Sequence, residues 1–120
     1  MADRALPPAD IPPLDFFTTW VPTRVAEDES RRSRLVGTEA ILEFVLLGEG
    51  GGIFTVQVAR GEVRGWAGGH AHPDLRIELE LETWRRLNAG ELSAPDAFLR
   101  RKVRLEGNLS LAVKLHLIIG

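Results

Sequence analysis

Alternation of apolar and polar residues between Gly37 and Leu81 is the feature that most constrains this chain. Its clearest part is the run 75–82, where four aliphatic residues alternate with four charged ones: Leu75, Arg76, Ile77, Glu78, Leu79, Glu80, Leu81 and Glu82. A period of two is typical of a β-strand with one buried and one solvated face. We therefore expect a sheet whose polar face is wet and whose apolar face is covered by other elements.

Glycine-rich breaks divide this region into four expected strands. The first places Ala40, Leu42, Phe44 and Leu46 on one face and Glu39 and Glu43 on the other. The turn 48–52 follows, and then a second strand sets Phe54, Val56 and Val58 against Thr55 and Gln57. Arg60-Gly61 predicts a tight hairpin into a third strand over 62–67, and residues 68–73 are expected to form a loop before the fourth strand.

Helical patterns precede the sheet. Residues 1–13 hold four prolines and are expected to form a flexible lead to a single domain over 14–120. From Leu14, apolar residues keep helical spacing with Phe17, Val21 and Val25, and Pro22 should end or bend this helix. The charged piece 24–34 is expected to continue helically to the sheet.

Two short helices and a fifth strand are expected after the fourth strand. Thr83 can cap a helix that runs through Asn88, and Ser93 or Ala94 can cap another over 95–101. Residues 102–106 alternate as a fifth strand, with Val103 and Leu105 facing inward. The final segment stays ambiguous, because residues 109–117 alternate as in a strand although Asn108 is a typical helix cap.

Composition limits the classes of function. The chain has 120 residues, a formal net charge of -2 and no cysteine. This charge argues against nucleic-acid binding, and the lack of cysteine excludes disulfides and thiolate chemistry. The N-terminal stretch lacks the basic start and apolar core of a signal peptide, and no apolar run is long enough to cross a bilayer, so a cytoplasmic protein is expected.

The polar motifs do not predict catalysis. His70 and His72 fall in a loop with Pro73 and are expected to be solvated, so no metal and no cofactor are predicted. The acidic residues of 75–82 fit a solvated sheet face, and turn 48–52 lacks the lysine of a phosphate loop. Because no nucleophile, base and orienting group converge at recognisable spacings, we do not expect an enzyme.

The order of elements, together with certain residues, resembles the sterol carrier protein 2 family of small lipid-binding domains. The resemblance covers 14–119 and rests on Gly52-Ile53-Phe54-Thr55-Val56-Gln57-Val58 with Gly61, on Trp84, Leu87 and Gly90-Glu91-Leu92, on Pro95-Asp96-Ala97-Phe98, and on the tract from Lys102 to Ala112. It implies an α+β fold with a twisted, mostly antiparallel five-stranded sheet, helices on one face and an apolar tunnel between the layers. It also implies that the final segment is a helix.

A lipid or another apolar small molecule is the partner that the resemblance implies: a fatty acyl, isoprenoid or quinone, or sterol-like ligand. The expected tunnel walls are apolar residues from both layers: Phe16, Phe17, Trp20, Phe44, Leu46, Val56, Leu79, Trp84, Leu87, Leu92, Phe98, Val113 and Leu117. The final helix is predicted to be a movable lid with transient membrane contact. The alternative is a structural domain with a filled core that docks a partner protein.

Overall fold

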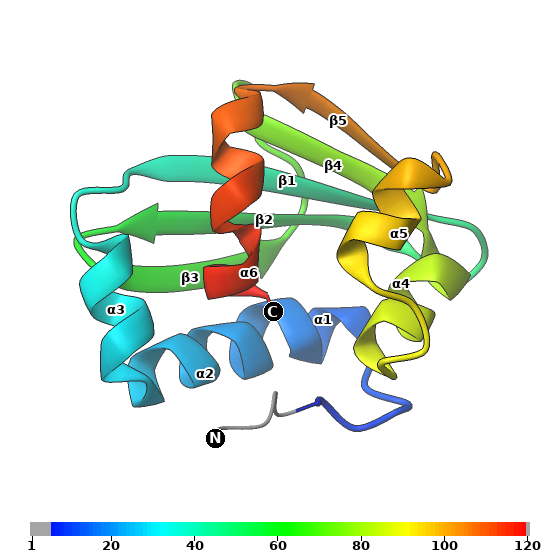
Figure 1. Cartoon of the computed structure of the whole chain (residues 1–120), viewed down its shortest axis with the longest axis horizontal. Coiled ribbons are helices and arrows are strands. Elements are labelled where there is room, and N and C mark those ends of the chain that lie inside the picture. The colour runs from blue at the N-terminus through cyan, green and yellow to red at the C-terminus, as the bar shows by residue number, and fades with distance from the viewer. Residues whose placement is uncertain (1–5, 120) are drawn as a thin grey trace.

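The chain folds into a five-stranded sheet that is covered on one face by helices (Figure 1). The structure is a computed structural model and describes residues 6–119. The strands are β1 (Ala40–Leu47), β2 (Gly52–Ala59), β3 (Glu62–Ala67), β4 (Leu75–Glu80) and β5 (Val103–Gly107). Their spatial order is β3-β2-β1-β4-β5. Only the pairing of β1 with β4 is parallel, and the other three pairings are antiparallel. The predicted α+β fold with a mostly antiparallel sheet is confirmed.

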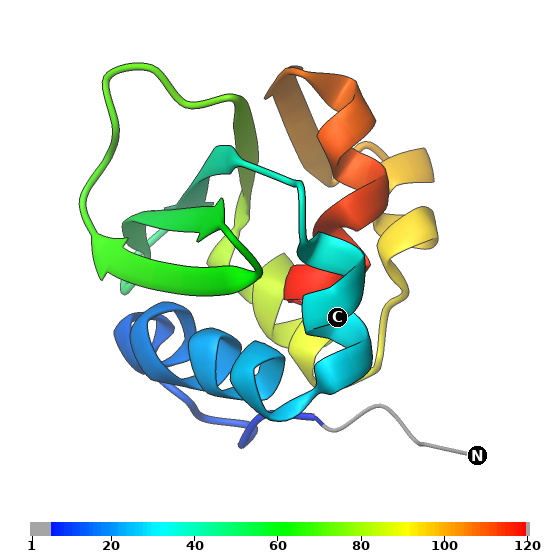
Figure 2. The ribbon, with the colours of Figure 1, turned by 90° about the vertical axis from the view of Figure 1, so that its left-hand side faces the viewer.

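The helices lie before β1, between β4 and β5, and at the C-terminal end. They are α1 (Pro13–Asp15), the π-helical η1 (Phe16–Trp20), α2 (Val21–Glu27), α3 (Glu29–Leu35), α4 (Leu81–Asn88), α5 (Ala94–Leu99), the 3-10 helix η2 (Leu109–Lys114) and α6 (Leu115–Ile118). Figure 2 shows the helices together on one side of the sheet. Among the described residues, no helix combines the length and apolarity needed to cross a bilayer.

Pro22 shapes the first helix without ending it. The chain stays helical from Pro13 to Glu27, but the stretch just before Pro22 is π-helical, and the amide of Val21 donates to the carbonyl of Phe16. In an α-helix the proline ring would collide with the carbonyl four residues earlier, and proline has no amide to donate. The π-helical turn before Pro22 is wider than an α-helical turn, and it lets the chain stay helical past the proline.

One end of the fourth strand differs from the sequence prediction. β4 stops at Glu80, and α4 begins at Leu81, so Leu81 and Glu82 are helical rather than part of the strand. Thr83 does not cap α4 but lies buried inside it. Leu81, Trp84 and Leu87 share a helix face, so at Leu81 a helical pattern overlaps the end of the period-two pattern. The predicted end of the fourth strand was therefore two residues too late.

Several local predictions hold. Arg60 and Gly61 both have positive φ, as a two-residue hairpin of type I′ requires. Ser93 caps α5 by accepting a hydrogen bond from the amide of Asp96 at 3.2 Å. Asn108 accepts from the amide of Ser110 at 3.1 Å, and the segment that follows is helical, as the resemblance implied. The flexibility expected of the lead 1–13 stays a prediction, and its residues 1–5 lie outside the described residues.

The outer face of the sheet is not uniformly wet. The loop 68–74 lies against its centre, on the side away from the helices (Figure 2). Thr55 donates through Oγ1 to the carbonyl of Gly68 at 2.7 Å, and the amide of His70 donates to Oε2 of Glu43 at 3.0 Å. Both Thr55 and Glu43 are buried as a result. The expectation of a solvated face is therefore wrong at its centre, because a loop covers it.

Candidate functional site

The inner face of the sheet is an apolar surface built from aligned rows of side chains. Strand registry aligns its side chains in rows that cross β1, β4 and β5. One row is Phe44, Ile77 and Leu105, and the next is Leu46, Leu79 and Val103. Since every member is aliphatic or aromatic, these rows offer packing surface but no proton donor or nucleophile.

Coverage of this surface decreases toward β5. The β1 and β4 members of both rows are buried, whereas Leu105 and Val103 on β5 are only partly buried, although they pack against the core. β5 is an edge strand, and α5, which precedes it, buries only Ala97 of its six residues. The apolar face is thus closed over β1 and β4 and partly open at the β5 edge.

Aromatic rings fill the space on the other side, beneath the first helix. Phe17 stacks on Phe54 with ring centroids 5.0 Å apart, and it lies 4.9 Å from Phe44. Phe16 meets Trp84 edge to face at 5.2 Å. Such contacts add packing energy beyond the burial of area. This part of the predicted wall is a packed core in the structure.

The predicted wall residues fall into three groups. Nine are buried: Phe16, Phe17, Phe44, Leu46, Val56, Leu79, Trp84, Leu92 and Leu117. Trp20 and Leu87 are partly buried against the core. Phe98 and Val113 are 55% and 70% exposed, so they lie on the surface. The structure brings the first two groups together, except for Leu92, which is buried outside the main cluster. Whether any of them touches a ligand stays a prediction.

Some inward residues were not among the predicted wall. Phe54 and Ile77 were placed on the apolar face by the strand pattern, as were Val103 and Leu105, but none was selected as wall. Ile118 is buried and was not singled out. The strand alternation already contained the signal for the first four. No pattern identified Ile118, because the final segment is apolar on nearly every side.

The final segment is attached to the helix that precedes the sheet. Arg31 of α3 donates through Nη1 to the carbonyls of His116 and Leu117 at 3.4 and 3.3 Å. Lys114 donates through Nζ to Oγ1 of Thr38 at 3.0 Å. Leu117 is buried, whereas Leu109 and Val113 are exposed. The segment is therefore anchored at its α6 end and lies on the surface along η2.

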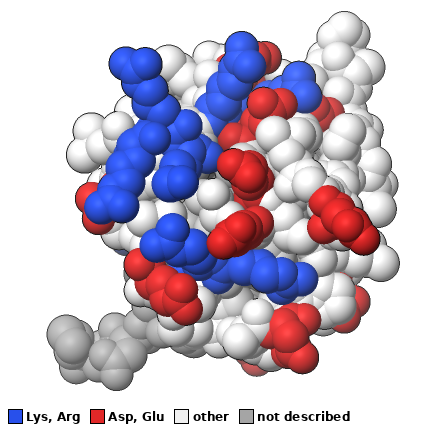
Figure 3. All heavy atoms as spheres, turned by 90° about the vertical axis from the view of Figure 1, so that its right-hand side faces the viewer, with Lys and Arg blue, Asp and Glu red and all other residues white. Residues whose placement is uncertain are grey.

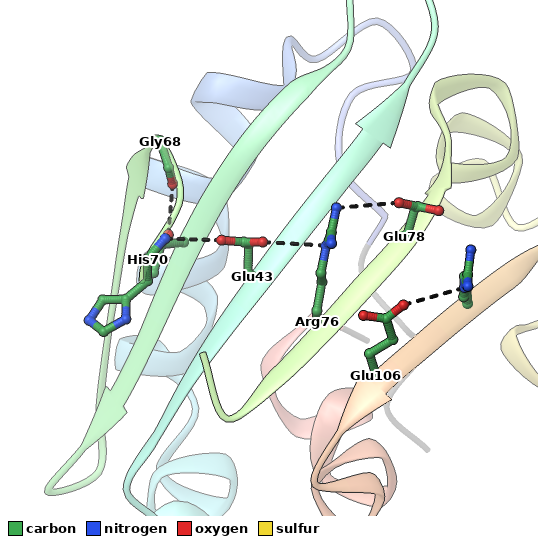
Figure 4. Close-up of polar contacts among 8 residues, drawn as sticks. Glu43, Gly68, His70, Arg76, Glu78 and Glu106 are labelled. Atoms are coloured by element: carbon green, nitrogen blue, oxygen red, sulfur yellow. Dashed lines mark hydrogen bonds and ion pairs between the residues drawn. The ribbon is translucent and has the colours of Figure 1, made fainter. Parts of the chain in front are cut away.

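Charged side chains on the outer face form ion pairs within and between neighbouring strands. Glu43 lies between the loop and β4 (Figure 4), with Oε1 3.4 Å from Nε of Arg76. That contact is an ion pair without a well-aligned hydrogen bond, because Nε of Arg76 has no hydrogen-bond partner. Arg76 also reaches Glu78 at 3.4 Å. Among residues 6–119, no three His, Asp or Glu side chains group as metal ligands would.

Comparison with known proteins assigns the fold to a family. A model of the SCP-2 sterol transfer family matches residues 21–119. The chain belongs to the SCP-2 sterol transfer family. The match spans the sheet, the covering helices from α2 onward and the final segment, and so includes both rows of the inner face but not α1 and η1.

Individual relatives agree with this assignment. Hydroxysteroid dehydrogenase-like protein 2 of Rattus norvegicus is 28% identical over 111 residues, which cover 88% of this chain and 21% of the relative. The chain thus spans about a fifth of that protein. A crystal structure of sterol carrier protein 2 has a TM-score of 0.66 at 20% identity and covers 87% of this chain and 91% of its own. The solution structure of palmitated SCP2L2 from Aedes aegypti has a TM-score of 0.60 at 20% identity, with coverage of 86% and 94%.

Proposed function

We propose that this domain of the SCP-2 sterol transfer family binds an apolar lipid between its sheet and helices, and carries or presents it without catalysing a reaction. The observation that supports this most is the half-covered inner face at β5, where Val103 and Leu105 remain partly exposed. A protein of similar fold, SCP2L2 from Aedes aegypti, is palmitated in its solved structure, and this supports an acyl chain as one class of ligand. The fatty acyl, isoprenoid or quinone, and sterol-like classes all suit a purely apolar surface, and the cytoplasm is the compartment we expect.

Burial alone can supply the affinity. At about 0.8 kcal/mol per buried methylene, a chain of about 16 carbons gains on the order of 12 kcal/mol. Association and ordering cost at least about 4 kcal/mol, which leaves roughly micromolar binding. No charged contact with the ligand is needed.

The direct test is titration of delipidated protein with a fluorescent fatty acid and with a quinone analogue. We expect saturable binding of at least one. Leu105→Gln should weaken it about tenfold, because a polar amide replaces apolar contact surface. Ile53→Gln is the matched control, since Ile53 is a partly exposed apolar residue of β2 on the opposite face. The proposal fails if neither probe binds saturably.

A filled core that docks a partner protein is the second candidate. It is favoured by the ring packing around Phe17 and by exposed apolar side chains at Ile53 and Trp66 on the outer face. Native mass spectrometry separates the two functions. Lipid that copurifies with the chain supports the carrier, whereas a lipid-free chain in a stable complex supports docking.

A further inference from the structure

Cationic residues gather at the corner formed by α5 and the start of β5. Residues 95–104 contain four cations, Arg100, Arg101, Lys102 and Arg104, and one acid, Asp96, in a chain whose formal net charge is -2. All four cations are exposed. Figure 3 views the molecule from the α5 side and shows a group of blue side chains at the upper left, a second blue stretch across the lower middle, and red side chains between and around them. Within residues 95–104, cations therefore outnumber acids four to one.

Two large apolar side chains lie beside these cations. Phe98 and Leu99, the last residues of α5, are 55% and 76% exposed. A single exposed apolar residue is common on protein surfaces and needs no explanation. Here two such residues are adjacent and three cations follow them directly, a combination that indicates a contact surface. We call Phe98, Leu99, Arg100, Arg101 and Lys102 the α5 corner.

The backbone holds the α5 corner in a fixed shape. The Ser93 side chain caps the start of α5, and the amides of Arg101 and Lys102 donate to the carbonyls of Phe98 and Ala97 at 3.0 and 2.8 Å. Both ends of this short helix are thus satisfied. Little backbone entropy would therefore be lost when a partner binds to this corner.

The cations of the α5 corner are free to meet an external anion. Arg104 lies 3.5 Å from Glu106 on the strand, but in the described part of the chain no ion pair engages Arg100, Arg101 or Lys102. Their charge is not neutralised within the fold.

We propose that the α5 corner docks on the surface of an anionic lipid bilayer, with Phe98 and Leu99 entering the interface and the three cations facing lipid phosphates. Apolar residues beside arginine and lysine are what interfacial anchoring requires. β5 follows the corner directly, so docking brings the partly open edge of the inner face toward the bilayer. Its role in lipid loading rests on the proposed function, whereas docking itself does not.

Sedimentation with vesicles tests the charges. The intact chain should bind vesicles of phosphatidylcholine mixed with phosphatidylglycerol, and bind pure phosphatidylcholine vesicles much less. Arg100→Gln with Lys102→Gln should lower the affinity about 25-fold, since each cation contributes about fivefold. Arg32→Gln with Arg34→Gln is the matched control, because both are exposed on α3, at the other end of the molecule (Figure 1), and should change little.

Leu99→Ser tests the apolar contact. It should lower vesicle affinity about tenfold, whereas Val36→Ser, at a residue 66% exposed after α3, should not. Failure of the intact chain to bind anionic vesicles overturns the docking proposal, and so do equal losses in the α5 and α3 variants. Fatty-acid affinity in solution is measured alongside. If the chain binds anionic vesicles but no fatty acid, the carrier function alone is contradicted. If it binds fatty acid but no anionic vesicles, docking alone is contradicted.

Discussion

Gly65 shows how one residue fixes the distance between the first helix and the sheet. A Cβ at this position of β3 would overlap the carbonyl oxygen of Phe17, which belongs to η1. Backbone stands on both sides of that contact, so no side-chain rotation relieves it. The aromatic packing of Phe17 therefore depends on a missing side chain on β3.

Gly65→Ala should lower the free energy of unfolding by about 3 kcal/mol, at the upper end of overpacking effects. Urea denaturation monitored by circular dichroism measures it. Gly68→Ala is the control, because open space surrounds its Cβ and only the positive φ causes strain, which costs about 1 kcal/mol. If both variants lose the same free energy of unfolding, the close approach of η1 to β3 at Gly65 does not determine the effect.

Asp28 is the residue that links pH to the anchoring of the C-terminal segment. The hydrogen bond from the backbone amide of Arg31 is the main cause that lowers the pKa of Asp28 below its ordinary value of 3.8, and the Arg31 charge adds to it. The carboxylate also holds Nε of Arg31 at 3.2 Å. The same guanidinium reaches His116 and Leu117.

A lowered pKa means that this stabilisation is present above pH 3.8 and is lost as the pH falls through the folded-state pKa. We expect the wild-type chain to lose stability relative to Asp28→Asn over that acid range, because Asn keeps the cap but does not titrate. Urea denaturation at a series of pH values measures the difference. A difference that does not change with pH contradicts this role of Asp28.

At the scale of elements, the final segment joins a partly exposed η2, whose Leu111 and Ala112 pack against the core, to an anchored α6. The lid expected from the sequence thus has one firm end, formed by Leu117 and by the contacts of Arg31 and Lys114. Any motion of the lid would start at η2, where Leu109 and Val113 are exposed. Exposed 3-10 turns are among the first elements to open.

Lys114→Met should raise amide hydrogen exchange in η2 about fivefold, because one hydrogen bond worth about 1 kcal/mol is lost. Thr38→Val removes the acceptor of the same bond and serves as the second arm of a double-mutant cycle. The double variant should exchange little faster than either single one. Additive effects would show that the Lys114–Thr38 contact does not hold the segment.

Patterning predicted the elements better than their ends. Period-two alternation located β1, β2 and β4 because apolar residues line the inner face of each strand, and the Arg60-Gly61 hairpin located β3. The alternation missed the start of α4, where Leu81 fits both periods. The final segment needed the family resemblance, since an apolar residue at nearly every position carries no period. Burial of Glu43 was not predictable, because it depends on where loop 68–74 folds back.

At the scale of the whole molecule, the sheet is packed at one end and partly open at the other. Rings around Phe17 close the side beneath the first helix, whereas Val103 and Leu105 mark the partly open edge at β5. The alternation of side chains predicted which residues face inward. It did not predict which end of the sheet is packed and which is partly open, because it carries no information on how far the helices cover each strand. The residues of the candidate site were predicted as the walls of a tunnel; the structure places most of them on or against the inner face, and the tunnel itself stays a prediction.

Methyl NMR of the delipidated chain during titration with palmitate tests the central claim most directly. We expect saturable shifts for the inward methyl groups of Leu79, Val103 and Leu105, with those of Ile53 and Leu47 on the outer face unchanged. Absence of shifts at the inward methyls, or shifts confined to the outer face, would contradict lipid binding between sheet and helices.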